Sequence, residues 1–144
     1  MPPPLLYLAG PLFNTHERWY LEQSARALEA AGYRTFLPHR DAGLLIDELT
    51  LARRTDLFRA DLAALDQADA GVALLTGADH DSGTSAEVGY LFARGKLCFG
   101  LTDDKRWLNN MLWGLCGEGQ RLAATIDELV ALVQSALPLT PPLR

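Results

Sequence analysis

Short apolar runs alternate along the chain with segments that have amphipathic helical spacing. Leu21, Ala25 and Leu28 recur at i, i+4 and i+7, and Gly32 follows where a helix C-cap belongs, so we expect a helix over residues 17–31. The apolar runs are rich in Leu, Val and Phe and have the length of buried strands. They cover residues 5–9, 34–37, 71–75 and 97–101.

The same spacing predicts further helices in the rest of the chain. Phe58, Leu62 and Leu65 repeat the i, i+4, i+7 pattern, and Gly95 follows another helical segment. A weak strand is expected near residues 121–124, and prolines end the last amphipathic stretch. The expected helices cover residues 48–68, 85–94, 107–115 and 126–137.

Strand and helix alternate strictly, and the strands are continuously apolar. This pattern predicts an α/β fold with a parallel sheet covered on both faces. With 144 residues, of which 49% are hydrophobic and 22% charged, the chain has the size and composition of one compact domain. We therefore expect a single domain over residues 1–144, with residues 138–144 as a tail.

Charge and cysteine usage narrow the class of ligand. The net charge is −5 and Lys and Arg do not cluster, which argues against a nucleic-acid polymer or an anionic membrane as partner. The first residues lack a secretory pattern, and no apolar run approaches the ~18 residues of a membrane span. Cys98 and Cys116 lack the spacing of a metal site or redox motif. We expect a cytoplasmic protein with reduced thiols and a small-molecule ligand.

The segment after the third strand carries two acidic residues, Asp81 and Glu87. Ligands of such sheets bind beyond the carboxyl ends of the strands, and a nearby helix N-terminus would keep Glu87 ionised, as a carboxylate nucleophile requires. The same spacing also fits a capping box between Thr84 and Glu87. Asp81 equally suits a turn-stabilising role. On spacing alone, these structural interpretations are the stronger ones.

Other polar residues also allow two interpretations. Asp61 suits a solvated helix flank and Asp69 a helix-to-strand turn. Tyr7 lies within an apolar strand, so its hydroxyl needs either a partner in the core or a site carboxylate to which it donates. Asn109 and Asn110 precede bulky apolar residues, which fits a helix start, a subunit contact or ligand recognition.

Several common sites are absent from the sequence. The loop around Asp79 and Asp81 is acidic and lacks the glycine motifs that bind phosphate, so a neutral polyol such as a sugar suits it better. The three histidines share no spacing for a metal or a triad, and no GxSxG motif occurs.

Four segments taken together resemble the nucleoside 2-deoxyribosyltransferase family in their order and spacing. They are residues 7–13, 61–69, 81–89 and 109–114. The resemblance implies a flavodoxin-like three-layer fold with a five-stranded parallel sheet of order 2-1-3-4-5. It also implies a retaining double displacement in which Glu87 is the nucleophile, Asp61 protonates the departing base and Tyr7 orients Glu87.

The resemblance further implies how substrates are held. Asp81 and Asn109 match the pair that binds the sugar 5′-hydroxyl, with Asn109 lent by a neighbouring subunit of a dimer-based homo-oligomer such as a hexamer. The substrates would be 2′-deoxyribonucleosides and free nucleobases, without cofactor or metal. Asp41 is our candidate for reading the base, although residues 38–43 match only loosely. Further substrate contacts are expected at Gly10, Phe13, Gly83 and Met111.

Three other functions compete with transfer. A 2′-deoxynucleoside 5′-monophosphate N-glycosidase is supported by Arg18 and Arg40, but Pro11 to Asn14 replace the small and basic residues that a phosphate needs. A plain nucleoside hydrolase would use water as the only acceptor. A non-catalytic nucleotide-sensing module could share the scaffold, since fold alone does not fix function.

Overall fold

The computed structural model describes residues 1–43, 50–77, 79–104 and 106–141, and these form a five-stranded sheet. All neighbouring strands are parallel, in the order β2-β1-β3-β4-β5, which confirms the predicted α/β class and strand order. The strands are β1 (Leu5–Ala9), β2 (Arg34–Phe36), β3 (Ala70–Leu74), β4 (Leu97–Leu101) and β5 (Leu122–Ala123).

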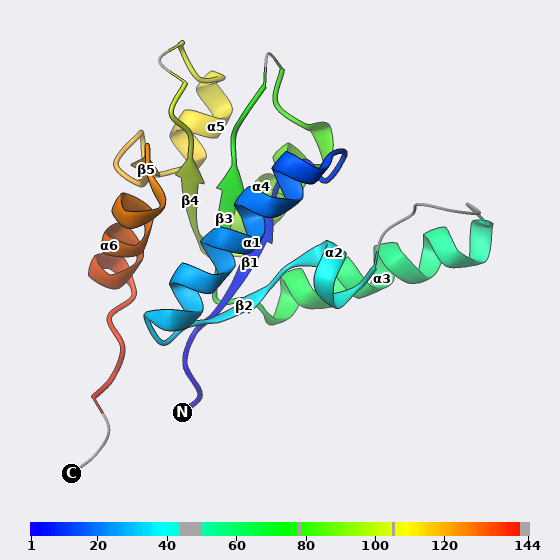
Figure 1. Ribbon diagram of the computed structural model, residues 1–144, viewed down its shortest axis with the longest axis horizontal. Coiled ribbons are helices and arrows are strands. Elements are labelled where there is room, and N and C mark those ends of the chain that lie inside the picture. Colours follow the sequence, from blue (N-terminus) through cyan, green and yellow to red (C-terminus); the bar gives the residue numbers. More distant parts are fainter. Residues whose placement is uncertain (44–49, 78, 105, 142–144) are drawn as a thin grey trace.

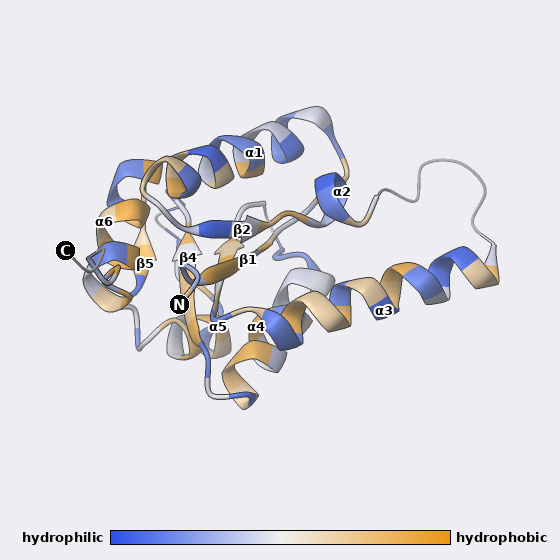
Figure 2. Ribbon diagram, turned by 90° about the horizontal axis from the view of Figure 1, so that it is seen from below, coloured by the Kyte–Doolittle hydropathy of each residue, from blue (hydrophilic) through white to orange (hydrophobic). Residues whose placement is uncertain are grey.

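Helices cover both faces of the sheet (Figure 1). One face packs against α1 (Thr15–Ala30) and α6 (Ile126–Ala136). The opposite face packs against α3 (Leu51–Gln67), α4 (Ser82–Ala93) and α5 (Asn110–Leu115). Figure 2 shows these layers from below, with α1 above the sheet and α3, α4 and α5 beneath it.

The structure differs from the sequence-based expectations at several helix ends. The helix α4 begins at Ser82 rather than Ser85, because Asp81 caps it. A one-turn helix, α2 (Pro38–Asp41), had not been expected. Two predicted features lie outside the described residues. They are the start of the second helix near Glu48 and the last three residues of the tail.

The two faces of the sheet carry side chains of different size. The face under α1 and α6 presents mainly bulky residues, namely Leu6, Leu8, Val72, Leu74, Phe99 and Leu101. Apart from Tyr7, the central strands present small residues to the α4 face, namely Ala9, Gly71, Ala73, Cys98 and Gly100. A Cβ at Gly71 would lie 2.3 Å from Cδ1 of Leu91 on α4. The α4 helix therefore packs closely on the sheet beside Tyr7.

Helix α3 extends well beyond the edge of the sheet (Figure 1). Only Ala64 and Leu65, near its C-terminal end, are buried. Leu51 and Phe58 in its first half are exposed. Among the helices in the described ranges, none is long and apolar enough to cross a membrane.

We predict that Gly71→Val destabilises the protein by about 1–3 kcal/mol, because the added methyl groups would overpack the contact with Leu91. Urea unfolding followed by circular dichroism measures the effect. The matched control is Gly89→Ala within α4, where a Cβ meets no atom within 4 Å. That control should be at least as stable as the wild type, because alanine favours the helix interior. Equal losses in both variants would contradict the prediction.

Candidate active site

Glu87 lies in the second turn of α4, whose N-terminus is capped by another residue. The carboxylate of Asp81 accepts hydrogen bonds from the backbone N–H and the hydroxyl of Thr84, both at 2.8 Å. The capping box predicted between Thr84 and Glu87 is therefore wrong. Because Asp81 is the N-cap, the side chain of Glu87 is left available for other contacts.

Burial dominates the electrostatics of Glu87. Loss of hydration raises the pKa of Glu87 to about 7, hydrogen bonding with Tyr7 opposes this rise, and the negative charges of Asp61 and Asp81 add to it. We had expected the helix N-terminus to keep this carboxylate ionised, but the dipole effect fades beyond the first turn. Glu87 is instead divided between its two protonation states near neutral pH.

The Tyr7 side chain lies on β1, beneath Glu87, and is fully buried. Its hydroxyl makes no hydrogen bond of standard geometry with the described residues, although it is close enough to Glu87 for each group to affect the other. Burial and then the charge of Glu87 raise the pKa of Tyr7. Tyr7 is thus a buried neutral hydroxyl close to a carboxylate, rather than a core tyrosine with its own partner among the described residues.

Asp61 and Glu87 face each other across a cleft of about 340 Å³ between α3 and α4. One carboxylate oxygen of Asp61 is buried without a partner in the described part of the chain, and burial raises the pKa of this side chain. The walls are mostly apolar, formed by Phe58, Leu62 and Leu65 of α3. Two carboxyl groups in a half-dry cleft can divide the roles of nucleophile and acid.

Two other residues expected at the site lie elsewhere in the chain. Asn109 and Met111 line a separate cleft of about 630 Å³ bounded by α4 and α5. Asn109 is the N-cap of α5, and its side-chain oxygen accepts from the Met111 N–H at 2.9 Å. Leu112 is buried, whereas Met111 and Trp113 are exposed. Within one chain, Asn109 and Glu87 therefore line different clefts.

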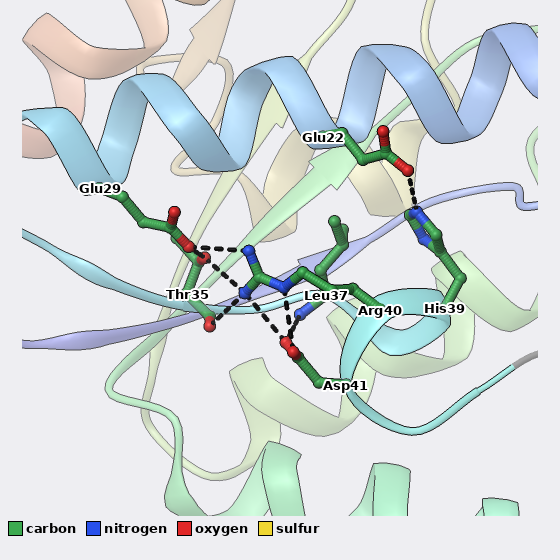
Figure 3. A network of polar contacts seen from close by, with 7 residues as sticks. All are labelled: Glu22, Glu29, Thr35, Leu37, His39, Arg40 and Asp41. Carbon is green, nitrogen blue, oxygen red and sulfur yellow. Dashed lines mark hydrogen bonds and ion pairs between the residues drawn. The ribbon is translucent and has the colours of Figure 1, made fainter.

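The remaining expected contacts are scattered. Gly83 lines the cleft of Glu87, but Gly10, Phe13 and Asp41 are not among its lining residues. Gly10 packs against Leu21, whose Cδ1 would lie 2.8 Å from an added Cβ. Phe13 is 80% exposed in the loop before α1. The carboxylate of Asp41 is bound to Arg40 and the Leu37 N–H in a polar network (Figure 3).

Asp69 has the structural role that its position predicted, since its carboxylate accepts from the Leu5 N–H at 2.7 Å. Phe58 entered the sequence-based prediction only through the spacing of a helix, whereas this side chain is 63% exposed and lines the cleft. Its spacing of three residues from Asp61 places both on one helix face and could have indicated this. Tyr90 was also missed; it lines the cleft and donates its hydroxyl to Asp66 at 2.5 Å.

Comparison with known proteins gives a family and a fold. Residues 6–126 match the family model described as nucleoside 2-deoxyribosyltransferase. Among curated protein sequences, none matches significantly. Among solved structures, a conserved protein from Enterococcus faecalis V583 superimposes with a TM-score of 0.81 at 23% identity, covering 94% of this chain and 99% of that one.

Two further solved structures that this chain resembles are named as enzymes. A 2-deoxyribosyltransferase from Bacillus psychrosaccharolyticus has a TM-score of 0.79 at 23% identity, covering 96% of this chain and 99% of that one. A CMP N-glycosidase from Clostridium botulinum has a TM-score of 0.61 at 20% identity, covering 92% and 99%. At these identities the three likenesses establish the shared fold.

We predict that Glu87→Gln stabilises the protein at neutral pH. Because the folded pKa of Glu87, about 7, exceeds its unfolded value, folding favours the protonated form, and this contribution is lost as pH rises from about 4.5 through 7. The advantage of Glu87→Gln over wild type should therefore grow across that window, by about 3 kcal/mol. Chemical unfolding at pH 4, 6 and 8 measures it. A difference that stays constant with pH would contradict the assignment.

Proposed function

Because this chain belongs to the nucleoside 2-deoxyribosyltransferase family, whose model spans residues 6–126, we propose that it transfers 2-deoxyribose between nucleobases. The observation that carries the proposal is the pairing of Glu87 and Asp61 across one cleft, with the Tyr7 hydroxyl directed at Glu87. A protein that only bound nucleotides would not need a half-ionised carboxylate in such a position.

In the first half of the proposed reaction, the ionised Glu87 carboxylate attacks the anomeric carbon of the nucleoside. The bond between that carbon and the base nitrogen breaks, and the electron pair leaves with the base. In the form that reacts, Asp61 holds the proton and Glu87 the charge, and Asp61 gives this proton to the departing base; burial raises the pKa of Asp61 in the direction that the acid role needs. The product is a deoxyribosyl ester of Glu87 with inverted configuration.

The second half runs in reverse with a new base as acceptor. A nitrogen of the acceptor attacks the anomeric carbon, the ester bond breaks and the Glu87 carboxylate is regenerated. Asp61 takes up the proton that the acceptor loses, which returns both carboxyl groups to their starting states. Two inversions give overall retention. The Tyr7 hydroxyl supports the ionised nucleophile at the start and at the end of the cycle.

The lining of the cleft favours nucleosides over nucleoside monophosphates. Of the described residues that line it, none is basic, so a phosphate would lack a charged partner. Arg40 is engaged with Glu29 and Asp41, and Arg18 donates to the Leu12 carbonyl. The likeness to a CMP N-glycosidase nevertheless makes hydrolysis of a monophosphate the second candidate.

We also propose that a neighbouring copy of the chain completes the site. Asp81 lies next to the cleft as the cap of α4, whereas Asn109 belongs to a different cleft of the same chain. A second subunit could bring its own Asn109 to the sugar 5′-hydroxyl held near Asp81. This arrangement would require a dimer-based oligomer.

Chromatography of reactions with deoxyinosine and adenine tests the proposed activity. We expect deoxyadenosine and hypoxanthine from wild type, and no turnover from Glu87→Gln, because the nucleophile is removed without loss of volume. Deoxyribose and hypoxanthine alone would indicate a hydrolase, and turnover of the 5′-monophosphate alone would indicate the nucleotide glycosidase. Full activity in Glu87→Gln would exclude Glu87 as the nucleophile. Circular dichroism confirms that the variant is folded.

The variant Asp61→Asn tests the proposed acid role of Asp61 separately from the proposed nucleophile role of Glu87. We expect it to slow turnover of deoxyinosine by about 10²–10⁴-fold, since the departing base then receives no proton. In 7-methyl-2′-deoxyguanosine the base is already cationic and can leave without being protonated. The rate of its turnover should therefore fall far less in Asp61→Asn. Initial rates of both substrates measure the contrast, and Glu87→Gln should lose both reactions. Equal losses on the two substrates in Asp61→Asn would contradict the acid role.

A further inference from the structure

Tyr7 is stacked against an aromatic residue of the neighbouring strand. Its ring and that of Phe36 have centroids 5.4 Å apart and an interplanar angle of 20°. The two residues are register partners in the parallel pair of β1 and β2, and both belong to the cluster on the face covered by α3 and α4. Phe36 therefore restrains the plane of the ring that carries the Tyr7 hydroxyl.

The backbone on both sides of Phe36 is anchored by the polar network of Figure 3. The Thr35 carbonyl accepts from Nη2 of Arg40 at 3.0 Å. The Leu37 N–H donates to Oδ2 of Asp41 at 2.8 Å. Arg40 is itself held by Glu29 of α1, with Nη1 donating to Oε1 at 2.9 Å. The end of β2 is thus tied to α1 and α2 on either side of the stacked ring.

We infer that Phe36 is a positioning residue, whose anchored ring holds the Tyr7 hydroxyl beside the Glu87 carboxylate. The inference rests on the proposed function for the role that it gives to Glu87. A tyrosine hydroxyl lies far from its Cα, so a small change in the χ1 angle of Tyr7 swings the hydroxyl a long way, and the stacked ring of Phe36 opposes a swing out of the ring plane. Hydrogen bonds weaken steeply as their angle departs from linear. Stacking keeps the ring in the orientation that Glu87 needs.

Loss of the Phe36 ring would change the ionisation of Glu87, which a loss of core packing alone would not do. Hydrogen bonding with Tyr7 opposes the rise that burial causes in the pKa of Glu87. If the ring of Tyr7 loses its support, this opposition weakens and Glu87 becomes harder to ionise. Asp61 of α3 and Asp81 at the cap of α4 also act on Glu87, and a change at Phe36 on β2 leaves both in place.

The test compares Phe36→Leu with two matched variants. Phe36→Tyr keeps the ring. Phe99→Leu removes a ring from the opposite face of the sheet, where Phe99 belongs to the other core cluster. We expect Phe36→Leu to lower kcat by about two- to tenfold, the range of one aromatic pair, with KM little changed. Its acid limb in the pH profile should move to higher pH, while Phe36→Tyr and Phe99→Leu keep the wild-type profile.

A second measurement needs no turnover. Protein labelled with ¹³C at glutamate carboxyl groups is titrated by NMR, and the Glu87 signal is assigned from its loss in Glu87→Gln. An upward shift of this titration in Phe36→Leu, but not in Phe36→Tyr, supports the inference even if the wild type transfers no deoxyribose. Activity without that shift would support the proposed function and overturn the inference. Should Phe36→Leu not fold, Phe36→Met fills the same space without a ring.

Discussion

Helix α4 can bring Glu87 close to Tyr7 because the strands beneath it present small side chains. Gly71 on β3 is the register partner of Tyr7 and leaves space that Leu91 of α4 fills. Protein interiors are close-packed, so a larger residue there would displace the helix or its neighbours. The other face of the sheet carries the bulky core that stabilises the fold. The face under α1 and α6 therefore provides hydrophobic burial, whereas the face under α4 allows Glu87 to approach the sheet.

This close approach to the sheet costs stability at Glu87. A carboxylate removed from water is disfavoured, and the raised pKa of Glu87 measures that penalty. The Tyr7 hydroxyl offsets part of it, and the negative charges of Asp61 and Asp81 increase it. The outcome is a carboxyl group that exchanges its proton near neutral pH, beside a second carboxyl group, Asp61, whose pKa is also raised. Such a pair can share acid and nucleophile roles without a metal.

The sequence predicts the strands better than the site. β1 and β4 have the predicted bounds because apolar runs mark buried strands directly. The helix containing Glu87 begins three residues early, because the spacing pointed to a cap at Thr84 when Asp81 holds that position. Asp41 looked available to read a base, but its carboxylate is engaged with Arg40. Periodicity identifies which residues share a helix face, as Phe58 and Asp61 do, whereas it cannot show which polar partners meet.

The surroundings of the carboxylates, rather than the carboxylates themselves, decide between transfer and hydrolysis. The glycosyl ester proposed on Glu87 would react with whichever nucleophile reaches the anomeric carbon first, and water is always present. In one chain the cleft is bounded by α3 and α4, and Phe58 at its wall is 63% exposed. Apolar surface of this kind favours a flat base over water. In the proposed mechanism, efficient transfer would therefore require that the acceptor base, or a second copy of the chain, covers the open side of the cleft before water reaches the ester.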